Sequence, residues 1–185
     1  MPHVLIVYAT SEGQTEKIAG YMAGRLRARG IQARALDVYA IADIASLTGQ
    51  SAVVVGGSVH AGRFQPALER FVGRFRAQLS AHPLTAFFSV SGTASRPEGE
   101  PCAREFTDRF LREADWKPTT VACFGGAIKY PRYDPVVRRL LRRITARAGG
   151  GTDLHREYEY TDWDRVDAFA DRFLTLADGS AGHGS

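Results

Sequence analysis

The first fifteen residues carry the strongest chemical signal in the chain. An apolar run from Val4 to Ala9 is followed directly by Thr10-Ser11-Glu12-Gly13-Gln14-Thr15. This order is typical of a buried strand that turns through a short loop into a helix. The loop would bring three hydroxyls and several backbone N–H groups to the positive end of the helix dipole. Such a spot holds a phosphate group, and we interpret it as the site of a flavin phosphate.

Residues that the loop lacks narrow the choice of ligand. A Gly-Lys-Ser/Thr ending is absent, which excludes a nucleoside-triphosphate loop. The G-x-G-x-x-G fingerprint of dinucleotide sites is also absent, and no Asp pair ends the strand as in a phospho-acceptor domain. Glu12 suits a phosphate monoester held by dipoles and hydroxyls rather than by Lys or Arg. The alternative without a ligand is an ordinary strand–turn–helix with a threonine cap.

Alternating strand and helix patterns must position this loop. Strands are expected at 4–9, 32–38, 52–57, 85–90 and 121–124, and helices follow them. A wholly apolar, β-branched run such as 52–57 is typical of a central parallel strand. The pattern predicts an α/β fold with a five-stranded parallel sheet of order 2-1-3-4-5, covered by helices on both faces. The loops after strands one, three and four would then meet at the carboxyl edge, where such sheets bind ligands.

The bulk composition limits where the protein works. One domain is expected over residues 1–177, and the Gly/Ser/His-rich tail 178–185 is expected to be disordered. Cys102 and Cys123 stand far apart without a C-x-x-C motif, so we expect a reducing compartment and no metal site. The first strand leaves no room for a signal peptide, and no apolar run has membrane-spanning length. These features predict a cytoplasmic protein, or one attached to a membrane from the cytosolic side.

A basic segment of about 129–152 is surplus to the five-strand pattern and reads as an insertion after strand five. Within it, residues 136–147 predict an amphipathic helix, with apolar residues on one face and five arginines crowded on the other. Such a helix can lie on an anionic membrane surface or contact a partner. The alternative is a surface helix packed on its own sheet. Nucleic acid is not expected as a partner, because no aromatic residues are interleaved with the arginines.

Several motifs together resemble a known family. They are the 10–15 loop, the Gly56-Gly57-Ser58 turn, Phe88-Ser89-Val90, the run Gly126 to Tyr133, the Gly149 to Asp153 turn and Tyr160-Thr161-Asp162-Trp163. From His3 to Leu176 the chain resembles flavodoxin-fold proteins, which are three-layer sandwiches. More narrowly, it is similar to the quinone-dependent, oxygen-independent protoporphyrinogen IX dehydrogenases of bacterial haem synthesis. The stretches 92–95 and 134–135 depart from the family pattern.

The resemblance implies FMN as cofactor, protoporphyrinogen IX as substrate, a respiratory quinone as electron acceptor, and peripheral association with the cytoplasmic face of the inner membrane. The phosphate is expected on the 10–15 loop, and the flavin ring between the loops 58–64 and 89–95. His60 or Phe64 is a candidate to stack on the ring. The expected cofactor-binding residues are therefore Thr10, Ser11, Glu12, Gly13, Gln14, Thr15, Ser58, Val59, His60, Ala61, Gly62, Ser89, Val90, Ser91 and Gly92.

For the substrate, arginines could pair with the two propionates of the tetrapyrrole and tyrosines could contact its rings. The candidates are Arg63, Arg96, Tyr130, Arg132 and Tyr133. No acid–base residue is required by this chemistry. Three other functions stay open: a flavodoxin-type electron carrier, an FMN-dependent quinone reductase with a nicotinamide donor, and a flavin-free scaffold. The net charge of +4 counts against the carrier, since carriers of this kind dock through acidic surfaces.

Overall fold

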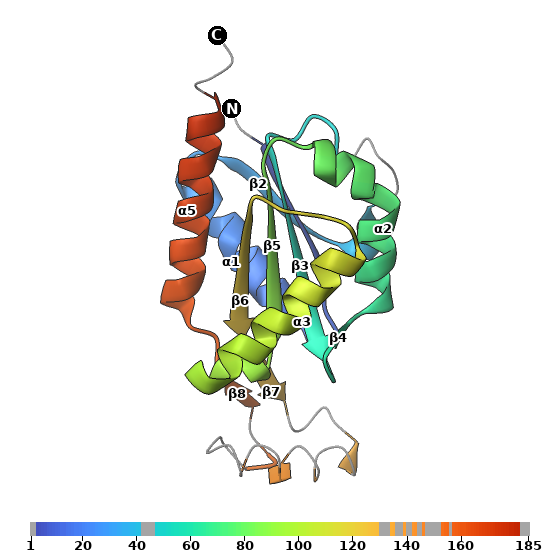
Figure 1. Cartoon of the computed structure of the whole chain (residues 1–185). Coiled ribbons are helices and arrows are strands. Elements are labelled where there is room, and N and C mark those ends of the chain that lie inside the picture. The colour runs from blue at the N-terminus through green and yellow to red at the C-terminus, as the bar shows by residue number, and fades with distance from the viewer. Residues whose placement is uncertain are drawn as a thin grey trace.

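The computed structural model describes residues 3–41, 47–129, 153–155 and 157–181, together with the isolated positions 134, 135, 139, 142, 143 and 146. Strands and helices alternate along the chain (Figure 1). The main elements are β1 (His3–Ala9), α1 (Gln14–Ala28), β2 (Gln32–Asp37), β3 (Ala52–His60), β4 (Arg63–Phe64), α2 (Pro66–Ala81), β5 (Thr85–Ser91), α3 (Glu100–Glu113), β6 (Thr120–Gly125), β7 (Ala127–Lys129), β8 (Glu157–Glu159) and α5 (Trp163–Ala181). Short 3₁₀ turns cover Val38–Ala40, Thr93–Ser95 and Pro97–Gly99.

The five long strands form a parallel sheet in the order β2-β1-β3-β5-β6. This is the predicted 2-1-3-4-5 order of the parallel strands, and the α/β prediction is confirmed. The central strands β1, β3 and β5 are buried along almost their whole length, as their β-branched and aromatic composition requires. Gly56 allows this packing, since a Cβ there would lie 2.1 Å from the Phe88 ring.

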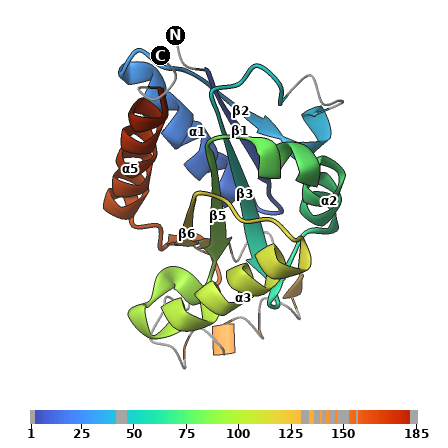
Figure 2. The same cartoon turned by 45° about the horizontal axis from the view of Figure 1, so that its top comes forward.

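Helices cover both faces of the sheet. Figures 1 and 2 show α1 and α5 on one face and α2 and α3 on the other. Each pair closes its own apolar cluster. Ile18 and Phe173 pack with Ile6 and Phe88 on the first face, and Phe75 and Phe110 pack with Val55 on the second. The sandwich therefore has three layers, with the carboxyl ends of all five parallel strands at one edge.

Helix boundaries follow local chemistry. After α1 the chain reverses at Gly30, which has a φ of +79°, and the N–H of Ile31 bonds to the Leu26 carbonyl. Pro66 opens α2 as expected. At the start of α5 the cap is Asp162, whose carboxylate accepts from the N–H of Arg165 at 3.2 Å. The Thr161 hydroxyl does not cap this helix, because it donates to the Gly125 carbonyl.

Three features differ from the sequence-based expectation. Residues 58–64, expected as a loop, form the end of β3 and an antiparallel hairpin with β4. The β7–β8 ribbon, a two-stranded antiparallel pair, was not predicted and lies below the carboxyl edge of the sheet (Figure 1). Helix α5 extends to Ala181, so it includes the first residues of the expected tail beyond 177. Residues 182–185 lie outside the described part.

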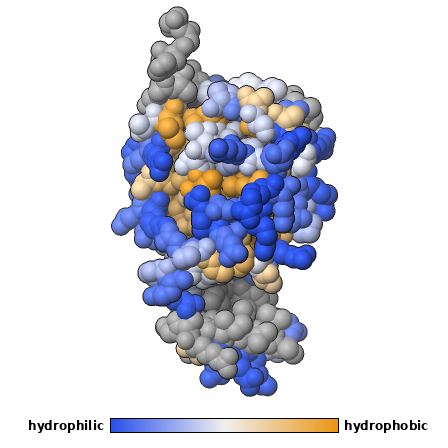
Figure 3. All heavy atoms as spheres, in the orientation of Figure 1, coloured by the Kyte–Doolittle hydropathy of each residue, from blue (hydrophilic) through white to orange (hydrophobic). Residues whose placement is uncertain are grey.

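The outer edge of β6 ends the sheet. Among the described residues β6 pairs with β5 alone, and a groove runs along its free edge between α3 and α5. On this face Figure 3 shows a band of hydrophobic side chains bounded by hydrophilic ones. The charged residues that line the groove are Arg104, Arg112, Lys117, Arg165 and Arg172 with Glu100, Asp108 and Asp115. No helix in the described ranges combines the length and apolar character needed to cross a bilayer.

Candidate functional site

The three predicted loops meet at the carboxyl edge of the sheet and enclose a hollow. Its walls come from the ends of β1, β3 and β5 and from the chain entering β7. The residues that line it are Thr10, Glu12, Gln14, Thr15, Ser58, Val59, His60, Val90, Ser91, Gly92, Gly126 and Ala127. No Lys or Arg is among these lining residues. A ligand here would be held by hydroxyls, backbone groups and the helix dipole.

The start of α1 has no side-chain cap. Gly13 precedes the helix with a φ of 85°, and no side chain caps the first-turn N–H groups. The Gly13 N–H donates to the Thr10 hydroxyl oxygen at 2.9 Å, which fixes the loop. Thr15 is fully buried, and its hydroxyl has no hydrogen-bond partner among the described residues. An unpaired hydroxyl beside an uncapped helix start fits a phosphate group, which supplies the missing acceptor.

Gln65, which sequence reasoning missed, fastens the 10–15 loop to β3. In the orientation in which the Gln65 amide nitrogen faces an acceptor and its oxygen faces donors, Nε2 donates to the Ala9 carbonyl at 3.1 Å. Oε1 then accepts from the Ser11 N–H at 2.9 Å and from the Ser58 hydroxyl at 2.7 Å. Ser11 therefore holds the loop in place rather than facing the hollow. Only the position of Gln65 directly before Pro66, at the start of α2, could have drawn attention to it.

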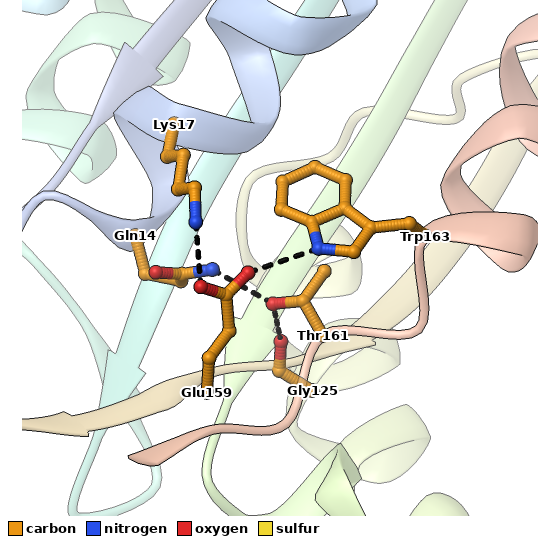
Figure 4. A network of polar contacts seen from close by, with 6 residues as sticks. All are labelled: Gln14, Lys17, Gly125, Glu159, Thr161 and Trp163. Carbon is orange, nitrogen blue, oxygen red and sulfur yellow. Dashed lines mark hydrogen bonds and ion pairs between the residues drawn. The ribbon is translucent and has the colours of Figure 1, made fainter. Parts of the chain in front are cut away.

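A polar network joins α1 to β8 and to the residues between β8 and the start of α5 (Figure 4). The Gln14 amide donates to the Thr161 hydroxyl at 2.8 Å, and that hydroxyl donates to the Gly125 carbonyl at 2.8 Å. Beside it, Glu159 accepts from the Lys17 ammonium and from the Trp163 indole N–H. Partial burial alone would raise the pKa of Glu159, but the hydrogen bond and charge of Lys17 outweigh it, so the pKa lies below its ordinary value.

The β3–β4 hairpin forms a second wall. Ala61 and Gly62 both have positive φ, 49° and 75°, as a two-residue hairpin turn requires. His60 lines the hollow, with its Nδ1 4.0 Å from a carboxylate oxygen of Glu12. Phe64 points the other way, with its ring centroid 4.5 Å from that of Phe110 in the core. The register places Phe64 in the interior, so the stacking hypothesis stays with His60 alone.

The third wall is the turn after β5. The Ser91 hydroxyl accepts from the Ala94 N–H at 3.0 Å, and the Ser91 carbonyl accepts from the Gly126 N–H at 2.9 Å. A Cβ on Gly126 would lie 3.3 Å from the Ser91 carbonyl carbon, so glycine suits this close approach. Ser89 is buried beneath the wall and accepts from the Thr107 hydroxyl at 2.9 Å. Its side chain supports the turn and does not line the hollow.

The expected site residues thus divide into groups. Ten of the fifteen expected cofactor residues line the hollow, while Ser11, Gly13, Ala61, Gly62 and Ser89 surround it. Gly126 and Ala127 line it although they were not predicted to contact the cofactor. The Gly125-Gly126 pair directly after a strand was the available signal.

The substrate candidates are less concentrated. Arg63 is exposed on the hairpin, and Arg96 is exposed beside a small pocket that Gly125 and Tyr160 also line. Neither arginine is among the residues that line the hollow. Tyr130, Arg132 and Tyr133 lie outside the described residues. So does most of the predicted basic helix 136–147, but its described positions Arg139, Arg142 and Arg143 are helical and exposed.

Comparison with known proteins places this architecture among flavodoxin-domain proteins. A family model described as a flavodoxin domain matches residues 5–155. The chain is 35% identical over 175 residues to protoporphyrinogen IX dehydrogenase (quinone) of Escherichia coli strain K12, covering 94% of this chain and 96% of that relative. It is 36% identical over 178 residues to the protein of the same name from Leishmania major, covering 95% and 76% of the two chains. Among solved structures, oxidised flavodoxin 1 from Bacillus cereus matches with a TM-score of 0.58 and 12% identity, over 94% of this chain and 97% of that one.

Proposed function

The chain belongs to the flavodoxin-domain family and, within it, to the protoporphyrinogen IX dehydrogenase (quinone) family, and from this membership we propose its reaction. It oxidises protoporphyrinogen IX to protoporphyrin IX and passes the electrons to a quinone. The conversion removes six electrons and six protons, so three quinones become three quinols for each porphyrin formed. The observation that carries the proposal is the uncapped start of α1, with the unpaired Thr15 hydroxyl, in a chain that spans 96% of its bacterial relative.

We propose FMN as the cofactor of the hollow. The uncapped N–H groups of α1 and the hydroxyls of Thr10 and Thr15 would hold its phosphate, and the walls at His60 and Ser91 would border its ring. FMN held there would supply the two-electron redox chemistry between the substrate and the quinone. The absence of Lys and Arg from the lining fits a monoester held by dipoles.

The chain's own residues have positioning roles in this reaction. The Gln65 clamp fixes the distance between the 10–15 loop and β3, and the Ser91–Gly126 bond fixes the opposite wall. Such fixed walls orient two reactants without a separate acid or base, because orientation lowers the entropic part of the barrier.

We propose that Arg63 and Arg96 pair with the propionates of the substrate. Both are exposed, and each lines a pocket next to the hollow: Arg63 one that it shares with Ala61 of the β3–β4 hairpin, and Arg96 one that it shares with Gly125. A guanidinium binds a carboxylate through two parallel hydrogen bonds, which a lysine cannot reproduce. Arg63→Lys and Arg96→Lys should therefore raise KM for protoporphyrinogen and leave FMN affinity unchanged.

We also propose that the basic segment 136–147 binds an anionic membrane surface on the cytoplasmic side. Exposed arginines at 139, 142 and 143 support this, since each cation near an anionic surface contributes about 1 kcal/mol. Replacing these three arginines with glutamate should abolish sedimentation with vesicles of anionic lipid, while binding of FMN persists. Unchanged sedimentation would identify the segment as an ordinary surface element.

The deciding experiment is anaerobic. The purified chain, reconstituted with FMN, is mixed with protoporphyrinogen IX, and porphyrin fluorescence is followed before and after a quinone is added. Porphyrin should form catalytically only with the quinone. Rapid NADH or NADPH consumption with the quinone and no porphyrin would instead identify a quinone reductase. A colourless protein that takes up no FMN would refute both.

A further inference from the structure

The Tyr160-Thr161-Asp162-Trp163 motif supplies none of the residues that line the hollow, yet Thr161 contacts one of them, Gln14. Figure 4 shows Thr161 between Gln14, at the first turn of α1, and Gly125, at the end of β6. One hydroxyl accepts from Gln14 and donates to Gly125, both at 2.8 Å. Gln14 lines the hollow and is buried. The motif therefore fixes the side chain of Gln14, which lines the proposed cofactor site.

The β7–β8 ribbon is fastened at the same place. Its strands pair Ala127 with Glu159, and Glu159 forms an ion pair with Lys17 of α1. On the other side the ribbon joins the β5 wall, because the Gly126 N–H bonds to the Ser91 carbonyl and the Tyr160 N–H bonds to the Gly126 carbonyl. The ribbon thus bridges the two ends of the hollow. Since Gly126 and Ala127 line the hollow, displacing the ribbon would displace part of its wall.

Glu159 also organises the charges around α1. It engages Lys17, which lies one turn along the helix from the 10–15 loop, and it accepts from the Trp163 indole at 3.0 Å. The Lys17 ammonium in turn lies 5.3 Å from the centre of the Trp163 ring, which itself contacts Tyr21. Lys17 therefore interacts with Glu159 and Trp163 and does not line the hollow. In the proposed anion site, the backbone N–H groups at the start of α1 bind the phosphate.

We propose that Thr161 and Glu159 are positioning residues for the cofactor, and that they couple cofactor binding to closure of the β7–β8 ribbon. This inference rests on the proposed FMN site. Thr161 fixes the Gln14 side chain, and Glu159 fixes the ribbon on α1. Binding of the phosphate at α1 and seating of the ribbon then favour each other. Linkage requires the effect to be reciprocal: loosening the ribbon weakens FMN, and FMN tightens the ribbon.

The first measurement is FMN affinity, followed by quenching of flavin fluorescence. Thr161→Val removes both hydrogen bonds and should raise the FMN Kd roughly tenfold, whereas Thr161→Ser keeps the hydroxyl and should restore wild-type affinity. Glu159→Gln keeps the shape but loses the ion pair and should raise the Kd roughly threefold. Glu100→Gln is the matched control, because Glu100 of α3 forms its ion pair with Arg165 of α5 and does not line the hollow. Its Kd should equal that of the wild type.

The second measurement is hydrogen exchange of peptides that cover residues 157–162, with and without FMN. In the wild type and in Glu100→Gln, FMN should slow exchange there. In Thr161→Val and Glu159→Gln the slowing should be reduced by about the same factor as the FMN affinity. A merely structural role would change exchange equally with and without FMN.

The outcomes distinguish a failure of the proposed FMN site from a failure of the proposed coupling. Wild-type protein that fails to bind FMN defeats the proposed function together with this inference. Wild-type protein that binds FMN, with Kd values for Thr161→Val and Glu159→Gln within twofold of it, overturns the coupling alone. FMN that slows exchange equally in wild type and variants also overturns it. Should Thr161→Val fail to fold, the exposed Glu159→Gln substitution decides the question by the same two measurements.

Discussion

Replacing Thr15 with valine should have opposite effects on the FMN-free protein and on FMN binding. The Thr15 side chain is fully buried, and its hydroxyl has no partner among the described residues. A buried unpaired polar group costs about 1–3 kcal/mol. Valine has nearly the same shape and a similar helix propensity, so Thr15→Val should raise the free energy of unfolding of the FMN-free protein by about 1 kcal/mol.

The complex should respond in the other direction. In our proposal the Thr15 hydroxyl donates to the FMN phosphate, and a hydrogen bond to a charged group contributes about 1.5–3 kcal/mol. Since about 1.4 kcal/mol corresponds to a factor of ten, the FMN Kd of Thr15→Val should rise roughly 10- to 150-fold.

Two assays test the predicted gain in stability and the predicted loss of FMN affinity. Urea unfolding, followed by the fluorescence of Trp116 and Trp163, gives the stability, and flavin quenching gives the Kd. Thr107→Val is the control, because Thr107 is equally buried but its hydroxyl is paired with Ala103 and Ser89. That variant should lose about 1–2 kcal/mol of stability. The reasoning is refuted if Thr15→Val destabilises the FMN-free protein as much as Thr107→Val, or keeps wild-type FMN affinity.

Three further predictions concern the framework of the site. Gln65→Ala removes the clamp between the 10–15 loop and β3, so it should cost about 2 kcal/mol in urea unfolding and weaken FMN in titration; unchanged values of both would contradict the clamp. Gly56→Ala places a methyl group 2.1 Å from the Phe88 ring and should cost about 3 kcal/mol by the same unfolding assay, and a smaller loss would show that the ring moves freely. Because Lys17 lowers the pKa of Glu159, the stability from this pair is present above the pKa of the unfolded carboxyl and lost as pH falls through the lower folded pKa. The decline in stability between about pH 5 and 3 should therefore be shallower in Glu159→Gln, and identical slopes would exclude the linkage.

The sheet and the general location of the hollow could be predicted because they depend on local patterns. Apolar runs such as 52–57 mark central strands, and parallel strands bring their carboxyl ends to one edge by topology alone. The 10–15 loop could be proposed as an anion site because its residue types carry that chemistry before any packing is known.

The supporting contacts could not be predicted, because they join residues far apart in sequence. Gln14 and Thr161 are 147 positions apart, and Gln65 reaches Ser11 over 54 positions. No periodicity marks such pairs. The role of Phe64 depended on the β3–β4 register, which pairs it with Val59 and sends its ring into the core. A shift of one residue would have turned that ring outward.

Within the described part of the chain, the outer edge of β6 has no partner strand, and this affects how copies of the chain meet. An unpaired strand edge is a template on which a second sheet can grow, and proteins commonly guard such edges with charge. The side chains that line the groove beside this edge include five cations and three carboxylates, so the groove carries a net positive charge. Two such borders brought together would repel each other, which disfavours fusion of two sheets into one. Dissolved ions shorten the reach of that repulsion to about 10 Å at 0.1 M, so self-association through this border should be least at low ionic strength.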